Sequence, residues 1–181
     1  SSSSERYYSH MDNDSDNDDE NARSQFGTKQ YWDDGYLGRG DFPAEEYSWY
    51  FGWEIIQNYV KEYLPRGNRE EDDDDDLHIL CPGIGNDRIL VDLYRAGYTH
   101  LTAFDYSPHA IERQQDLISY ELPSSKSRAI ELYAMDARKL PDPDWTDRFD
   151  AIVEKGALDA IYLSGDGNVE RAVENLHRVL K

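Results

Sequence analysis

The sequence has little cysteine and no long apolar segment. Cys81 is the only cysteine in 181 residues, so no disulfide can form within the chain, and a reducing compartment is the natural setting. No run of about 18 apolar residues occurs, and the N-terminus lacks the basic and then apolar segments of a signal peptide. We therefore expect a soluble, cytoplasmic protein that does not enter a membrane.

Basic side chains are few, with 19 Lys and Arg against 38 Asp and Glu, and the formal net charge is -19. Two segments carry most of this charge: residues 1–25 have a net charge of -5, and residues 70–76 are seven acids in a row. Such a field disfavours nucleic acid and anionic membranes and favours a basic partner or substrate. We expect a disordered acidic tail over 1–29 and an acidic surface loop over 68–76.

The acidic tail also lacks the pattern of a calcium-binding loop. Residues 12–16 resemble the start of such a loop. However, Asn17 stands where the sharp turn needs glycine, and Arg23 stands where a bidentate glutamate is needed. We predict no metal site.

Residues 30–181 have the pattern of an α/β domain. The apolar runs and helical repeats predict strands at about 77–81, 100–104, 129–134 and 149–153 and helices at about 86–96, 108–121 and 168–180. Such alternation implies a mostly parallel sheet, with ligands beyond the carboxyl ends of its strands. An aromatic, turn-punctuated segment follows Gln30, and residues 45–64 repeat apolar side chains at helical spacing, which predicts an amphipathic helix before the sheet.

Each of the first three strands ends in a residue suited to an adenosine-containing cofactor. Gly83 and Gly85 allow the backbone to pass close to a ligand, and the amides at the next helix start favour a carboxylate or phosphate. Asp105 lies 22 residues after Gly83 and could accept hydrogen bonds from both ribose hydroxyls. Asp136 is placed to accept from an adenine amino group. Alone, either acid could equally be a cap or turn residue.

Two absent motifs distinguish between cofactors. The dinucleotide fingerprint requires a third glycine at position 88, where the chain has Arg88, and we expect this side chain to intrude where the pyrophosphate would lie. The Gly-Lys-Ser/Thr sequence of a nucleotide-binding P-loop does not occur. S-adenosylmethionine has no pyrophosphate, so the shorter glycine turn suffices. These absences favour S-adenosylmethionine.

The motifs resemble those of the class I S-adenosylmethionine-dependent methyltransferases, and in particular the translation elongation factor 1-alpha lysine methyltransferases and their methyltransferase-like relatives. The resemblance rests on five segments in order: Tyr31-Trp32-Asp33-x-x-Tyr36, Gly83-x-Gly85-Asn86, Phe104-Asp105-Tyr106-Ser107, residues 135–140 and residues 149–160. It implies a Rossmann-like, three-layer α/β sandwich over residues 30–181, with a mostly parallel sheet.

The resemblance also implies the residues of a cofactor site. Those expected to contact S-adenosylmethionine, or its product S-adenosylhomocysteine, are Trp32, Tyr36, Trp49, Gly83, Gly85, Asp105, Tyr106, Asp136, Ala137 and Lys155. An aromatic face stabilises a cation by about 0.5 to 2 kcal/mol, although these aromatics could instead only pack a helical lid. Glu154 and Asp159 are candidates to assist proton loss or to bind the substrate ammonium, but each could equally cap a helix or form a salt link.

The resemblance implies methyl transfer to a lysine of a basic protein such as translation elongation factor 1-alpha. A small-molecule methyltransferase and a catalytically silent interaction protein remain as alternatives. The chain departs from the family at Cys81, where many members have an acid, and at Asp87, which adds negative charge near the cofactor carboxylate. The family continues after Leu180 with three more strands. We therefore expect the fourth strand to be an edge of an incomplete sheet. The chain would then be a fragment, an alternatively terminated form, or half of an assembly in which a partner or second copy covers this edge.

Overall fold

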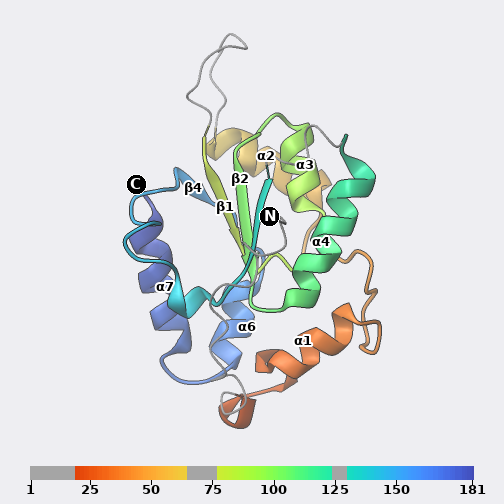
Figure 1. Ribbon diagram of the computed structural model, residues 1–181, viewed down its shortest axis with the longest axis vertical. Helices are drawn as coiled ribbons and strands as arrows, with labels where there is room; N and C mark the ends of the chain where they lie inside the picture. Colours follow the sequence, from red (N-terminus) through yellow and green to blue (C-terminus); the bar gives the residue numbers. More distant parts are fainter. Residues whose placement is uncertain (1–18, 65–76, 124–129) are drawn as a thin grey trace, which may run out of the picture.

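The computed structural model describes residues 19–64, 77–123 and 130–181, and its centre is a parallel sheet (Figure 1). Within these ranges the strands follow the order β3-β2-β1-β4, and every pairing is parallel. The strands are β1 (Ile79–Pro82), β2 (Leu101–Asp105), β3 (Ile130–Ala134) and β4 (Ala151–Ile152).

Helices cover both faces of the sheet and make three layers. On one face lie α2 (Trp53–Tyr63), α3 (Ile89–Arg95) and α4 (Pro108–Glu121), and on the other lies α7 (Asn168–Val179) (Figure 1). Successive strand residues face opposite layers: Ile79 and Cys81 pack with α2, α3 and α4, whereas Leu80 packs with α7. Burial on both faces explains why β1 is a continuous apolar run. β3, the last strand on one side of this order, alternates instead and exposes Glu131. The predicted α/β sandwich with a parallel sheet is confirmed.

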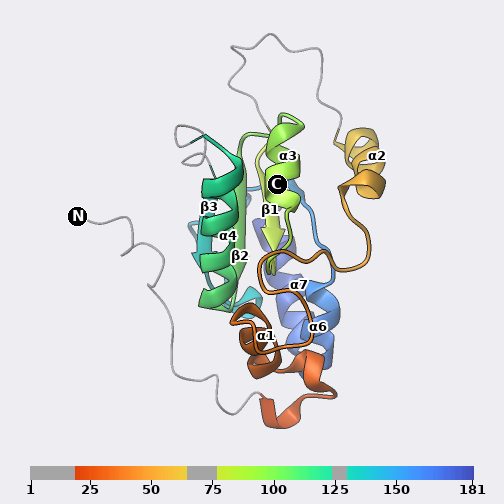
Figure 2. The same cartoon turned by 90° about the vertical axis from the view of Figure 1, so that its right-hand side faces the viewer.

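Two further helices lie at one end of the sheet. α1 (Lys29–Tyr36) and α6 (Ala157–Leu163) are found beyond the carboxyl ends of the strands in both views (Figures 1 and 2). Parallel strands all end at the same edge, and this edge is where an open α/β sheet binds its ligands. The two helices therefore enclose the space in which the sequence predicts a site.

The predicted helices before and after the sheet need correction. The helix expected over 45–64 begins only at Trp53. Residues 37–52, between α1 and α2, form an irregular strap, which is joined to the segment after β1 because the Tyr47 amide donates to the Asn86 carbonyl at 3.2 Å. Conversely, the segment expected to be turn-rich folds as α1, whose first turn is capped by the Thr28 side chain accepting from the Tyr31 amide. α6 was not predicted.

Part of the predicted acidic tail packs on the domain. Residues 19–29 contain two 3-10 helices, η3 (Asp19–Asn21) and η4 (Gln25–Gly27). The Arg23 amide donates to the Leu163 carbonyl at 2.7 Å, which joins this segment to α6. The packed chain therefore begins before residue 30. Residues 1–18 and the predicted acidic loop at 68–76 lie outside the described residues.

The fourth strand pairs on one side with β1. On its other side Phe149, two residues before β4, forms a parallel bridge with Leu180, and the Lys181 amide donates to the Phe149 carbonyl at 2.9 Å. The chain after α7 thus turns back along the expected edge. That a partner or second copy covers this edge stays a prediction.

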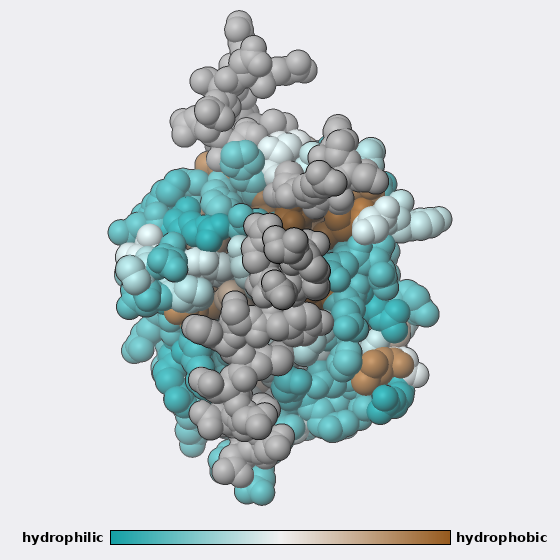
Figure 3. Space-filling model, viewed as in Figure 1, coloured by the Kyte–Doolittle hydropathy of each residue, from teal (hydrophilic) through white to brown (hydrophobic). Residues whose placement is uncertain are grey.

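One face of the domain is largely polar. On the face shown in Figure 3, hydrophilic residues predominate and hydrophobic ones form separate patches. None of the helices in the described ranges combines the length and apolar character that a membrane span requires.

Candidate functional site

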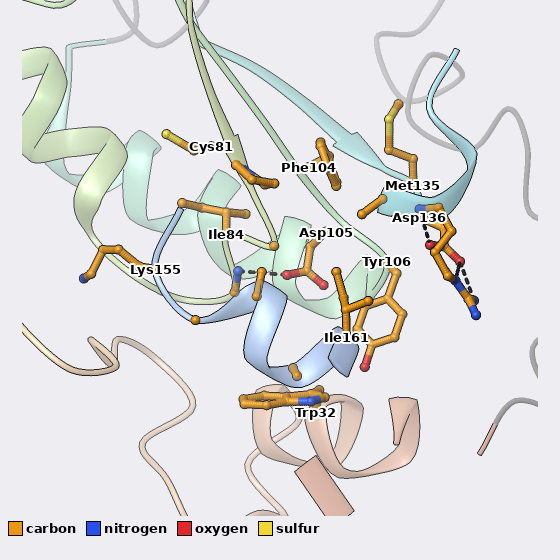
Figure 4. A pocket seen from close by; sticks show the side chains of 18 of the residues that line it. Trp32, Cys81, Ile84, Phe104, Asp105, Tyr106, Met135, Asp136, Lys155 and Ile161 are labelled. Carbon is orange, nitrogen blue, oxygen red and sulfur yellow. Dashed lines mark hydrogen bonds and ion pairs between the residues drawn. The ribbon is translucent and has the colours of Figure 1, made fainter. Parts of the chain in front are cut away.

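An open cavity of about 1000 Å³ lies at the carboxyl ends of the strands, between the sheet, α1 and α6 (Figure 4). The structure brings all ten predicted cofactor residues into its lining, namely Trp32, Tyr36, Trp49, Gly83, Gly85, Asp105, Tyr106, Asp136, Ala137 and Lys155. Asp159 also lines it, whereas Glu154 does not. The individual roles of these residues stay predictions. The sheet topology brings together those at the strand ends, whereas Trp32, Tyr36 and Trp49 reach the cavity from α1 and the segment after it.

The glycine turn, residues 83–85, follows β1 at the cavity wall. Gly83 and Gly85 have φ angles of 57° and 54°, a region that favours glycine. A Cβ atom at Gly83 would lie 2.3 Å from the Ala157 Cβ, and one at Gly85 would lie 2.8 Å from the Tyr36 hydroxyl. The turn therefore needs glycine for both conformation and space, because it packs directly against α6 and α1.

Two buried amides hold this turn in place. The Gln114 Nε2 group, on α4, donates to the carbonyls of Gly85 at 2.9 Å and Asp87 at 2.8 Å. The Asn86 Nδ2 group donates to the Pro43 carbonyl at 2.7 Å and so ties the strap to the turn. Asn86 belongs to one of the motifs in the sequence, but the motif does not predict this contact. No sequence pattern predicts the role of Gln114, because its contacts join residues far apart in the chain.

Asp105 ends β2 at the centre of the site and is only 3% exposed. Its Oδ2 atom accepts from the Gly85 amide at 2.9 Å (Figure 4), and its Oδ1 atom accepts from the Ser107 amide at 2.9 Å. Burial raises the pKa of Asp105 to about 6, although these two amide donors lower it. A carboxylate offers roughly four acceptor positions, so Asp105 can still accept from two donors of a ligand.

Contacts with α4 and the segment before it hold α1 over the cavity. The Ser107 hydroxyl donates to Asp33 in a short hydrogen bond. The Arg113 Nε group, on α4, donates to the Tyr36 carbonyl at 2.8 Å. Ser107 therefore contacts Asp105 through its amide and α1 through its hydroxyl, which links the position of α1 to that of the buried carboxylate.

Several aromatic residues of α1 and the strap, among them Trp32, Tyr36 and Trp49, both pack together and line the cavity. The rings of Trp32 and Trp49 meet edge to face at a centroid distance of 5.4 Å, and those of Trp32 and Tyr36 stack at 6.4 Å. Trp32 and Tyr106 lie on the α1 side of the space that Asp105 faces (Figure 4). The same aromatic side chains can thus pack against one another and still present a surface to a ligand.

Asp136 lies at the other side of the cavity from Lys155 (Figure 4). Its Oδ1 atom accepts from the Arg138 amide at 2.8 Å and caps the 3-10 helix η5 (Ala137–Lys139), and its Oδ2 atom pairs with the Arg138 guanidinium at 2.6 Å. The carboxylate is therefore a cap as well as part of the cavity wall.

The negative charge of Asp87 is paired. Its Oδ2 atom lies 2.5 Å from the Lys155 Nζ atom, and its Oδ1 atom accepts from the Ile89 amide at the start of α3. Both side chains of this ion pair are mostly buried. In Figure 4 the Lys155 amino group points away from Asp105. The extra charge that the sequence places near the cofactor carboxylate is thus compensated within the protein.

Arg88 does not line the cavity, so the expected intrusion of its side chain into the ligand space is wrong. Its guanidinium instead pairs with Asp92 and Glu46, each at 3.2 Å. The position still lacks the glycine of a dinucleotide fingerprint.

The two candidate catalytic acids occupy different surroundings. Glu154 caps α6, because its Oε1 atom accepts from the Leu158 amide at 2.9 Å. Asp159, in the first turn of α6, accepts a hydrogen bond from the Tyr50 hydroxyl at 2.7 Å. Within the described ranges, no group of three or more His, Cys, Asp or Glu side chains is arranged to hold a metal ion.

Comparison with known proteins agrees with this geometry. A family model described as a methyltransferase domain matches residues 80–181, more than half of the chain. The chain belongs to this methyltransferase family. Its similarity to class I methyltransferases of known structure confirms the predicted Rossmann-like fold: the chain matches a glycopeptide N-methyltransferase complexed with sinefungin (TM-score 0.55, 15% identity, 74% of this chain and 52% of that chain). It also matches a putative S-adenosylmethionine-dependent methyltransferase from Methanococcus maripaludis (TM-score 0.54, 18% identity, 70% of this chain and 49% of that chain).

Curated relatives include proteins named for lysine methylation. The chain is 30% identical to EEF1A lysine methyltransferase 2 of Mus musculus over 175 residues, covering 90% of this chain and 65% of that protein. The corresponding Homo sapiens protein is 30% identical over 170 residues, covering 87% of this chain and 65% of that protein. An "eEF1A lysine and N-terminal methyltransferase homolog" of Drosophila melanogaster is 26% identical, covering 85% and 20%. The chain thus spans less than two thirds of the length of these relatives.

The cavity fits the cofactor of the methyltransferase family, S-adenosylmethionine. Its volume is that of a small-molecule site, and the glycine turn leaves backbone rather than side chains at its wall. Asp105 supplies free acceptor positions for hydroxyl groups, and the aromatic cluster supplies faces suited to a cation.

The glycine turn provides a matched test of the packing at the cavity wall. Gly83→Ala and Gly38→Ala each place alanine at a positive φ, at a cost of about 1 kcal/mol, but the nearest atom to a Cβ at Gly38 is 3.9 Å away. We expect Gly83→Ala to lower the free energy of unfolding by clearly more than Gly38→Ala in urea denaturation, because α6 must move. Equal losses would contradict the tight packing of the turn against α6.

Proposed function

We propose that the cavity binds S-adenosylmethionine and that the protein transfers a methyl group to a lysine side chain of a basic protein, with translation elongation factor 1-alpha as the leading candidate. The observation that carries the cofactor part is Asp105, a buried carboxylate bonded to the glycine turn and open to the cavity. The names of the relatives at 30% identity support the substrate part.

In this proposal the ends of successive strands hold different parts of the cofactor. Asp105 accepts hydrogen bonds from the ribose hydroxyls, while Asp136 and Ala137 border the adenine. The glycine turn approaches the amino-acid part through its backbone. The aromatic faces of Trp32 and Trp49 exclude water and favour positive charge.

When bound, S-adenosylmethionine supplies a methyl group activated by a positively charged sulfur. The residues of the chain therefore need only to position the acceptor amine, exclude water and stabilise the charge that the amine gains. The acceptor nitrogen must first lose a proton, because an ammonium has no free electron pair. The net charge of -19 favours association with a basic protein.

Replacing Asp105 tests the cofactor site. We expect S-adenosylmethionine to raise the melting temperature of the unmodified protein and Asp105→Ala to abolish most of this shift. The variant removes two charge-assisted hydrogen bonds, which corresponds to a loss of affinity of roughly 100-fold. Differential scanning fluorimetry measures the shift. An unchanged shift in the variant, or none in the unmodified protein, would contradict the assignment.

Mass spectrometry tests the substrate. We expect purified translation elongation factor 1-alpha to gain mass in steps of one methyl group on lysine when incubated with the protein and S-adenosylmethionine, and not with Asp105→Ala. A parallel incubation compares transfer of tritiated methyl groups to the protein and metabolite fractions of a cell lysate. Label found only in metabolites would indicate a small-molecule methyltransferase, and no label in either fraction would indicate an inactive interaction protein.

A further inference from the structure

Tyr50 is an exposed aromatic residue at the cavity, held in a constrained backbone conformation. It lines the cavity, is 68% exposed and has a φ angle of 62°, which is uncommon for a bulky residue. Its ring lies against Gly156, where a Cβ atom would be 2.9 Å from the ring, and its hydroxyl donates to Asp159 at 2.7 Å. Strained, non-glycine residues of this kind concentrate at ligand sites.

The Tyr50–Asp159 pair lies beside the proposed cofactor space. Two consecutive residues at the start of α6 have different neighbours. Gly156 lies against the ring of Tyr50, and Ala157 lies against Gly83 of the glycine turn. Asp159 follows within the first turn of the same helix. The pair and the glycine turn are therefore separated by only the start of α6.

We propose that Tyr50 and Asp159 form the acceptor site, which receives the terminal amine of a lysine side chain. This assignment rests on the proposed function. The Asp159 carboxylate attracts the ammonium as it enters and accepts an N–H hydrogen bond from the neutral amine. The ring of Tyr50 provides a face that favours positive charge, and its hydroxyl fixes the carboxylate.

The charge change in the reaction favours this arrangement. The lysine ammonium first releases a proton to solvent. The amine nitrogen then bonds to the methyl carbon as the bond from that carbon to sulfur breaks, and the electron pair of that bond stays on sulfur. Positive charge thus moves to the nitrogen, and the product later releases another proton to solvent. A carboxylate and an aromatic face at the nitrogen stabilise this shift more in the transition state than in the neutral amine.

The surrounding charges select an amine over an anionic acceptor. Glu154 and Asp159 both act on the Tyr50 hydroxyl, and the hydrogen bond to Asp159 is the main cause of its raised pKa. The hydroxyl therefore stays protonated as a donor, and the site as a whole is negative. A carboxylate or phosphate group would be repelled here.

Binding of a lysine analogue tests the site without turnover. The probe is n-butylammonium, which carries the end of a lysine side chain, added to protein saturated with S-adenosylhomocysteine. We expect it to perturb the NMR resonances of the Tyr50 ring, assigned by their loss in Tyr50→Phe. Asp159→Asn should weaken this binding by roughly 10-fold, because the charge-assisted hydrogen bond is lost. No perturbation in the unmodified protein would overturn the proposal.

Turnover of translation elongation factor 1-alpha gives a second readout. We expect kcat/KM for this acceptor to fall roughly 10- to 100-fold in Asp159→Asn and in Tyr50→Gly. Tyr50→Gly also relieves the positive φ, so its melting temperature should not fall, which separates loss of function from loss of fold. Tyr59→Ala is the matched control: Tyr59 is 60% exposed on α2 and does not line the cavity.

The cofactor-induced rise in melting temperature distinguishes the two proposals. We expect S-adenosylmethionine to raise the melting temperature by the same amount in Tyr50→Gly, in Asp159→Asn and in the unmodified protein. If the unmodified protein shows no rise, the proposed function fails. If the rise is normal throughout and the Tyr50 and Asp159 variants behave like Tyr59→Ala, the acceptor site is wrong. A rise lost in these variants would also overturn it, because the pair would then belong to the cofactor site.

Discussion

The buried carboxylate of Asp105 is the interaction on which the rest of the site depends. One oxygen accepts from the Gly85 amide and the other from the Ser107 amide, so a single side chain fixes the glycine turn after β1 and the start of the helix after β2. Ser107 in turn bonds to Asp33 and holds α1 above the cavity. Removing the carboxylate would therefore loosen both the glycine turn and α1, which both line the cavity. This is why a residue at one strand end can organise a cavity whose walls come from distant parts of the chain.

Holding that carboxylate in the core has an energetic cost that a ligand can offset. Burial raises its pKa from the ordinary 3.8 to about 6, so the folded state binds a proton more readily than the unfolded chain. The titration of Asp105 thus makes the free protein more stable as the pH falls from 7 towards 4, and less stable as it rises. Donors from a bound ligand would favour the ionised form. A buried carboxylate with a raised pKa is typical of a site organised for function.

The sequence was sufficient to predict the sheet and the meeting of the site residues at its strand ends, because both follow from local pattern and topology. The aromatic residues of the site were expected only from the resemblance to the methyltransferase family. The predicted strands lead to Gly83, Asp105 and Asp136, and parallel strands bring their carboxyl ends to one edge. What the sequence missed depends on contacts between distant segments. The strap before Trp53 is bonded to Asn86, α1 is held by Ser107, and Gln114 holds the glycine turn from α4. No periodicity in the chain reports these hydrogen bonds, and none reports that Tyr50 reaches α6.

If an ionised Asp105 holds the cofactor, the affinity of the protein for S-adenosylmethionine must depend on pH. Isothermal titration calorimetry from pH 5 to 8 would measure the dissociation constant, with Asp105→Ala as the control and circular dichroism to verify that the fold persists. With the pKa of this carboxyl at about 6, the account predicts constant affinity above pH 7 and a loss approaching tenfold for each unit below pH 6. The weak residual binding of Asp105→Ala should lack this dependence. Affinity that stays constant down to pH 5 in the unmodified protein would contradict the account.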